Sequence, residues 1–295
     1  MDRSISSHSF RDRIKRRGEQ GFTSIMGKRG ICMTLQSIEP KILELIETFD
    51  GRIAYKIEND RGESISYHEH EAFQSASLIK IPMIIEGYRQ AENKDIYLNQ
   101  PLTIPRNEVT RGSGVLHTLS DKVFLTVEDL LTLMITISDN TSTNMMMTLL
   151  TFEKINQCIQ ELGLENTVLQ RRMFDFKALK EGRDNTMSAA DTVLCLKAIH
   201  TGDFLTKASQ ERILDIFEQQ QFKERLPAMM GKGVKVGNKT GSLRGVMHDA
   251  AIIRSETETV CAAVLTEDMA SEEESRQIIS KIGKLIYDEM MKEQN

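Results

Sequence analysis

The chain has 295 residues, of which 40% are hydrophobic and 27% charged, and its formal net charge is -5 at pH 7. This is enough sequence to bury a core in one large domain or in two lobes. The negative charge argues against a nucleic-acid partner, because phosphate binding requires a clustered excess of Lys and Arg on one face.

Residues 1–33 are basic and rich in Ser, Gly and Arg, a composition typical of a disordered segment. A nucleic-acid or anionic-lipid arm is the alternative interpretation. The segment lacks the apolar stretch of a signal peptide, and no run in the chain approaches the about 18 to 20 apolar residues of a membrane span. The four cysteines form no CxxC pair, so we expect buried free thiols at Cys158, Cys195 and Cys261. We therefore expect a cytoplasmic protein without a membrane span, and a monomer.

The folded part opens with a helix and two strands. Apolar residues at helical spacing predict a helix over 40–49, which Gly51 ends. Strand-like runs over 52–57 and 63–67 flank Asn59-Asp60-Arg61-Gly62, whose residues suit a tight hairpin turn.

The middle of the chain is helical. Capping-box patterns at 126–129 and 188–191 each precede an apolar periodic run. Gly163 suits the end of a helix that begins near residue 153. The methionines at 145–147 are predicted to fill the core.

Strands return after Gly231, over 234–239, 250–254 and 260–266, and a final helix spans about 271–291. This order predicts an α+β fold, in which an antiparallel sheet flanked by the terminal helices is interrupted by an all-α lobe. We expect one catalytic domain over 34–295. Its α+β lobe would comprise about 34–76 and 230–295, and its all-α lobe about 77–229.

Three polar motifs lie where these predicted helices and strands begin or end. The first is Ser77-Leu78-Ile79-Lys80, directly before an apolar run in which Pro82 suits a first helical turn. Residues three apart share a helix face, so Lys80 can reach the Ser77 hydroxyl. Burial and the positive helix end would lower the pKa of Lys80, so that a neutral amine can accept the serine proton. Taken alone, the pattern is also typical of a helix cap followed by a lysine whose stem packs on the surface.

The second motif, Ser138-Asp139-Asn140, lies between two apolar helical runs. All three residue types are favoured helix caps, which is the structural interpretation. The functional interpretation gives Ser138 a proton relay and gives Asn140 an amide that binds the amide of a substrate.

The third motif, Lys239-Thr240-Gly241-Ser242, ends a strand-like segment. An edge strand offers unpaired backbone groups to an extended substrate, and Gly241 permits a close backbone approach. Lys239 would attract a substrate carboxylate, to which the hydroxyls of Thr240 and Ser242 can donate. A solvated strand end with a glycine turn is the simpler alternative.

The three motifs together, in the order SxxK, SDN and KTG, resemble those of the class A β-lactamases and penicillin-binding proteins. The resemblance spans about residues 34–292. It implies that Ser77 is acylated by a β-lactam or a peptide-like amide, that Lys80 activates it, and that Ser138 protonates the leaving nitrogen. It further implies that Lys239 and Thr240 hold the carboxylate, that the backbone N–H groups of Ser77 and Ser242 form the oxyanion hole, and that no metal or organic cofactor takes part.

The chain departs from this family in two places. The family has an ExxLN pattern that positions the hydrolytic water, and residues 171–179 lack it. Asp175 is the nearest candidate base, with Glu181 second; the alternative for Asp175 is a structural carboxylate paired with Arg171 or Arg172. Arg183-Asp184 resembles the arginine-aspartate pair that pins the family's loop.

The second departure concerns an arginine that the family places on the following strand to assist carboxylate binding. Arg244 is too close to Ser242 to match it, and His248-Asp249 enters that strand instead. A histidine there is more often structural than a ligand.

The leading hypothesis is a β-lactamase-type serine hydrolase. A D-Ala-D-Ala peptidase, a β-lactam-sensing module that acylates without turnover, and an intracellular esterase or amidase remain as alternatives.

Overall fold

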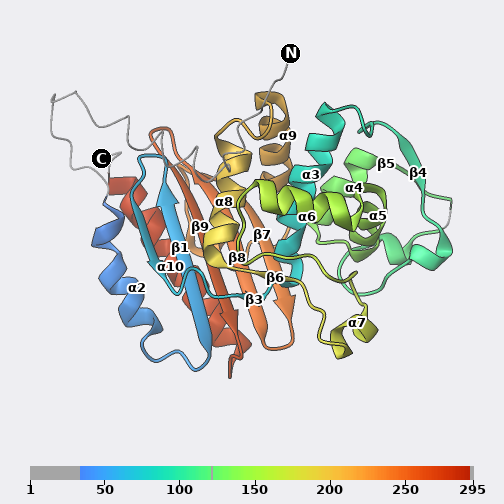
Figure 1. Ribbon diagram of the computed structural model, residues 1–295. Coiled ribbons are helices and arrows are strands. Elements are labelled where there is room, and N and C mark those ends of the chain that lie inside the picture. The colour runs from blue at the N-terminus through green and yellow to red at the C-terminus, as the bar shows by residue number, and fades with distance from the viewer. Residues whose placement is uncertain (1–33, 121, 293–295) are drawn as a thin grey trace, which may run out of the picture.

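The computed structural model describes residues 34–120 and 122–292; the expectation of disorder over 1–33 lies outside them. A five-stranded antiparallel sheet has the order β2-β1-β9-β8-β7. Its strands are β1 (Arg52–Asn59), β2 (Ser64–Tyr67), β7 (Lys235–Leu243), β8 (Val246–Arg254) and β9 (Thr259–Glu267). The β1–β2 hairpin is as predicted, and β7 lies at the edge of the sheet next to the helical lobe (Figure 1).

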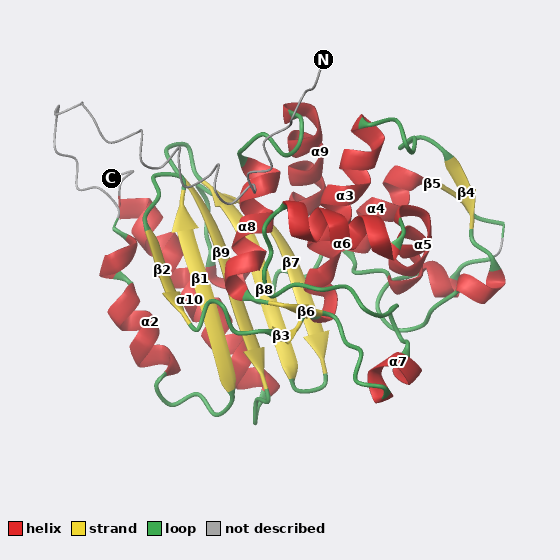
Figure 2. Cartoon of the chain, viewed as in Figure 1, coloured by secondary structure: helices red, strands yellow, loops and turns green. Residues whose placement is uncertain are grey.

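The two terminal helices, α2 (Glu39–Ile46) and α10 (Glu272–Lys292), cover one face of the sheet (Figure 2). Their apolar stripes bury Ile42, Ile282 and Ile286 against strand residues such as Val264. The predicted terminal helices are thereby confirmed. The antiparallel sheet flanked by them is confirmed as well.

The opposite face of the sheet packs against helix α8 (Ala189–His200), which joins it to the helical lobe. The other helices of that lobe are α3 (Lys80–Glu92), α4 (Val127–Thr136), α5 (Asn140–Leu150), α6 (Phe152–Glu161), α7 (Phe176–Lys180) and α9 (Lys207–Glu218). The lobe also contains short strands: β4 (Pro101–Thr103) pairs with β5 (Phe124–Thr126), and β6 (Thr186–Met187) pairs with β3 (Phe73–Gln74). The range predicted as all-α is thus helical with three short strands, and its exact division from the α+β lobe stays a prediction.

Short 3-10 turns complete the chain: η1 (Leu35–Ser37), η2 (Ala76–Ile79), η3 (Arg106–Glu108), η4 (Leu116–Thr118) and η5 (Leu226–Met229). Local capping agrees with the sequence. Thr126 and Asp129 form the full capping box of α4. Ser188 caps α8, whereas the Asp191 carboxylate accepts from the Asn166 backbone and the Thr167 hydroxyl.

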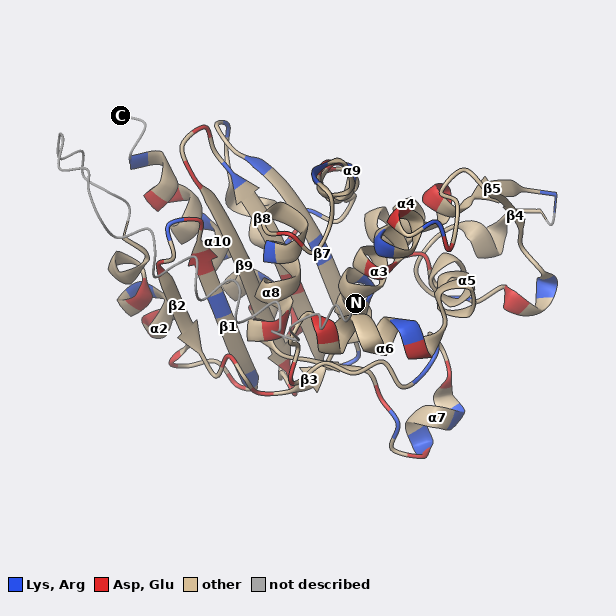
Figure 3. Ribbon diagram, turned by 45° about the horizontal axis from the view of Figure 1, so that its top comes forward, with Lys and Arg blue, Asp and Glu red and all other residues tan. Residues whose placement is uncertain are grey.

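Buried and exposed residues also follow the predictions. Met145, Met146 and Met147 are buried in the core, and Cys158, Cys195 and Cys261 are buried free thiols. Residues of both charge signs occur along α2, α6 and α10 (Figure 3). Among residues 34–120 and 122–292, no helix combines the length and apolar character that a membrane span requires.

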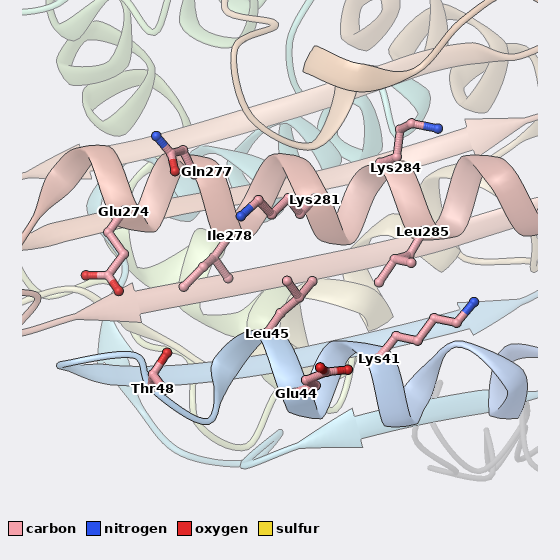
Figure 4. A pocket seen from close by; sticks show the side chains of 10 residues that line it. All are labelled: Lys41, Glu44, Leu45, Thr48, Glu274, Gln277, Ile278, Lys281, Lys284 and Leu285. Carbon is pink, nitrogen blue, oxygen red and sulfur yellow. The ribbon is translucent and has the colours of Figure 1, made fainter.

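A hollow of about 670 Å³ lies between α2 and α10 (Figure 4). Leu45, Ile278 and Leu285 form its floor, and lysine and glutamate side chains stand around it. It lies on the face of the sheet that the terminal helices cover and includes none of the three motifs. The site described next is formed instead where β7 meets the helical lobe.

Candidate active site

Ser77 lies in the 3-10 turn η2, which leads directly into α3. The prediction of a serine at a helix start, with Pro82 in the first turn, is confirmed. The preceding residue, Ala76, has a φ of 45°, a left-handed conformation that an alanine adopts only at a cost of about 1 to 3 kcal/mol. The Ser75 N–H donates to the Asn185 carbonyl at 2.8 Å, and this anchors the strained turn.

Lys80, one turn after Ser77, is completely buried. Its ammonium donates to the Ser138 carbonyl at 2.9 Å, to Ser138 Oγ at 3.0 Å and to Asn140 Oδ1 at 3.2 Å. Burial lowers the pKa of Lys80 to about 7, against the opposing effect of the Asp139 charge. A large fraction of this amine is therefore neutral at physiological pH, as a general base requires. The alternative of a surface lysine is excluded.

The loop between α4 and α5 presents Ser138 and Asn140 to Lys80. Asp139 is the cap: its Oδ1 accepts from the Ser142 N–H at 2.9 Å, and its Oδ2 accepts from two N–H groups of the 113–116 loop. Ser138 itself has a φ of 56°. The cap interpretation is therefore confirmed for Asp139, whereas the proton relay of Ser138 and the substrate contact of Asn140 stay predictions.

Lys239 approaches the same hydroxyl from the edge strand β7. Its ammonium donates to Ser138 Oγ at 3.1 Å and to the Thr240 carbonyl at 2.7 Å. Burial lowers the pKa of Lys239 well below its ordinary value, and the nearby charges of Lys80 and Arg225 lower it further. Among the described residues, neither lysine forms an ion pair with a carboxylate. An anionic ligand bound beside these two amines would therefore favour their protonated, positively charged forms.

Gly241 brings β7 against the nucleophile turn. A Cβ at this position would lie 3.2 Å from Cβ of Ala76 and 3.3 Å from the carbonyl oxygen of Ser75. The close approach expected from the glycine is therefore present, and Ser242 follows it as an exposed residue at the mouth of the site.

Arg225, which the sequence did not indicate, lies behind this strand. Its guanidinium donates to the Gly241 carbonyl at 2.8 Å, to the His248 carbonyl at 2.5 Å and to Ser242 Oγ. It comes from the segment before η5, and neither spacing nor motif in the sequence connects it with β7. Only the fold brings this cation to the KTG motif.

Arg244 and His248, the two residues considered in the sequence for the cation that assists carboxylate binding, do not take this role. Arg244 lies in the exposed turn between β7 and β8. His248 is buried, its Nε2 lies 2.8 Å from the Gln74 carbonyl, and its Nδ1 accepts from the Thr266 N–H at 3.1 Å. Burial lowers the pKa of His248 to about 4. It is a neutral structural histidine, as the sequence interpretation favoured.

The loop over residues 171–184 is pinned at its ends. Arg171 Nε lies 2.6 Å from Asp184 Oδ1, and Asn185 Oδ1 accepts from the Gln170 and Arg171 N–H groups. Asp184 is therefore the closing residue, but its partner is Arg171, whereas the predicted neighbour Arg183 pairs with Glu181.

Asp175 has a local role in this loop. Its Oδ1 accepts from the Ala178 N–H at 2.9 Å and caps α7. The alternative pairing with Arg171 or Arg172 is wrong, because Arg171 binds Asp184 and Arg172 binds Glu108. The hydrogen bonds of the site join Lys80, Ser138, Asn140 and Lys239. The described contacts of Asp175 include none of these four residues.

Comparison with known proteins shows the family of the chain. The sequence pattern of the Beta-lactamase enzyme family matches residues 37–290. Beta-lactamase FAR-1 of Nocardia farcinica is 28% identical over 219 residues, which cover 72% of this chain and 69% of that protein.

Two solved structures share the fold. A β-lactamase from Sphaerobacter thermophilus superimposes with a TM-score of 0.81 at 29% identity, covering 89% of this chain and 98% of that one. PBP-A superimposes with a TM-score of 0.80 at 27% identity, covering 91% and 100%. The family pattern extends over most of the chain, and the fold and the three motifs agree with it. The chain therefore belongs to the β-lactamase enzyme family.

Proposed function

We propose that this protein is a class A-like serine β-lactamase that opens the β-lactam amide through an acyl-enzyme on Ser77. The observation that carries the proposal is the hydrogen-bonded row Lys80–Ser138–Lys239 beside the Ser77 turn. It combines a base of lowered pKa, a hydroxyl that can relay a proton and a cation for a carboxylate. Family membership and the likeness to β-lactamase structures support it.

In acylation, the neutral amine of Lys80 accepts the proton of Ser77 Oγ while this oxygen attacks the lactam carbonyl carbon. The carbon–nitrogen bond of the ring then breaks. Ser138 donates its proton to the leaving nitrogen and recovers one from the Lys80 ammonium, to which it is already hydrogen-bonded at 3.0 Å. Proton transfer of this kind contributes about 10²- to 10⁴-fold to rate.

Binding of the substrate carboxylate falls to the β7 side of the site. Lys239, Thr240 and Ser242 would surround it, with Arg225 adding charge from behind through Ser242 Oγ. The backbone N–H groups of Ser77 and Ser242 would hold the oxyanion, and Asn140 would donate to the substrate's side-chain amide. Gly241 would allow β7 to lie close enough to the Ser77 turn for these contacts.

Deacylation needs a group that activates water. Asp175 remains the proposed base, and to serve it must exchange its cap hydrogen bond for a water. Lys80 is the second candidate, because its pKa of about 7 suits it for either step.

Intact-mass measurement after mixing with benzylpenicillin tests the proposal. The wild type should gain the mass of one penicillin and lose it within minutes, with penicilloic acid released. Ser77→Ala should form no adduct. Ser75→Ala, a matched change in the same turn, should still form it.

Two results would contradict the proposal in different ways. An adduct that persists indefinitely would indicate a sensor or a penicillin-binding protein without turnover. Unchanged hydrolysis in Ser77→Ala would remove Ser77 as the nucleophile.

A further inference from the structure

Two exposed phenylalanines stand on the 171–184 loop. Phe174 is 47% and Phe176 60% exposed, and their rings make an edge-to-face contact with centroids 5.4 Å apart. Grouped apolar side chains at a surface mark binding sites more often than isolated ones do.

The pair lies next to the proposed substrate contacts. A Cβ on Gly112 would lie 2.7 Å from Cζ of Phe174 and 2.8 Å from Nδ2 of Asn140. The ring of Phe174 and the amide of Asn140 therefore both lie close to the position that a Cβ on Gly112 would take. Asn140 in turn accepts a hydrogen bond from Lys80.

The loop holds the rings in a fixed position. Asn144 binds Met173 twice, accepting from its N–H at 2.8 Å and donating to its carbonyl at 3.1 Å. The next residue, Phe174, has a φ of 62°, which is unusual for a bulky side chain. Backbone strain of this kind is concentrated at functional sites.

We propose that Phe174 and Phe176 form an apolar wall that binds the acyl side chain of the substrate and favours aromatic side chains. The inference rests on the proposed function. A lactam seated between Ser77 and β7 would present its side-chain amide to Asn140. The group beyond that amide would then meet Phe174 beside Gly112, with Phe176 extending the wall by its edge-to-face contact.

Two substrates that differ only in this group test the inference. Benzylpenicillin carries a phenylacetyl side chain, whereas 6-aminopenicillanic acid has the same nucleus without it. We expect Phe174→Ala and Phe176→Ala to lower kcat/KM for benzylpenicillin about tenfold, and to leave that for 6-aminopenicillanic acid within about twofold. Phe174→Leu should retain most of the preference, because it keeps an apolar surface.

Phe124→Ala is the matched control, since Phe124 is 72% exposed on β5, outside this loop. It should change neither substrate. An equal loss of kcat/KM for both substrates in both alanine variants, or no loss for either substrate, would overturn this inference but not the proposed function. Absence of any acylation in the wild type would instead overturn the proposed function, and this inference with it.

Discussion

The buried amine of Lys80 makes a prediction about pH. Its pKa of about 7 places the neutral form at about one tenth at pH 6 and nine tenths at pH 8. If this amine accepts the Ser77 proton, the acylation rate at saturating substrate should rise about tenfold between these pH values and then level off. Stopped-flow measurements with a chromogenic cephalosporin give this rate directly.

The same burial lowers the stability of the folded protein, and this cost also depends on pH. A folded pKa of about 7 against an ordinary 10.5 means that burial disfavours the protonated amine by a free energy of about 5 kcal/mol. The unfolded chain binds the proton more readily between these values, so Lys80 costs the most stability below about pH 7 and progressively less as the pH rises toward 10.5. Its three hydrogen bonds offset the cost by about 1 kcal/mol each.

Lys80→Met combines the two effects. It should lower acylation by 10²- to 10⁴-fold while raising the free energy of unfolding by about 1 to 2 kcal/mol at pH 7. Urea denaturation at pH 7 and pH 9.5 should show this gain shrinking at the higher pH. A wild-type acylation rate that is flat from pH 6 to 8, or a variant that keeps the wild-type rise, would refute Lys80 as the base.

Three further substitutions test other parts of the site. Asp175→Asn retains a favoured helix cap, so the fold should persist while the acyl-enzyme accumulates in intact-mass spectra; wild-type turnover would remove Asp175 from the mechanism. Arg225→Gln should lower kcat/KM for benzylpenicillin about 10- to 100-fold, and Arg225→Lys should retain part of the wild-type kcat/KM. An equal loss with the penicillin methyl ester would show that Arg225 does not act on the substrate carboxylate. Gly241→Ala should slow acylation by up to about tenfold at a nearly unchanged Tm, because its Cβ pushes β7 from Ala76 by a few tenths of an ångström; a full wild-type rate would mean that this approach does not set the geometry.

Local sequence was enough to predict the main helices and strands and to single out the three motifs. Periodicity, capping residues and turn residues act between neighbours in the chain, so α2, the β1–β2 hairpin, the capping box of α4 and the terminal helix could be predicted from local sequence. The resemblance of SxxK, SDN and KTG to a known family added what local patterns lack, namely that Lys80, Ser138 and Lys239 meet.

The charges around that meeting point depend on how distant segments of the chain pack together. Arg225 reaches Ser242 because η5 packs behind β7, and Asp184 pairs with Arg171 across the whole loop rather than with its neighbour. Phe174 contacts Gly112 for the same reason. Contacts between distant segments depend on how whole elements pack, and short sequence patterns carry no record of that packing.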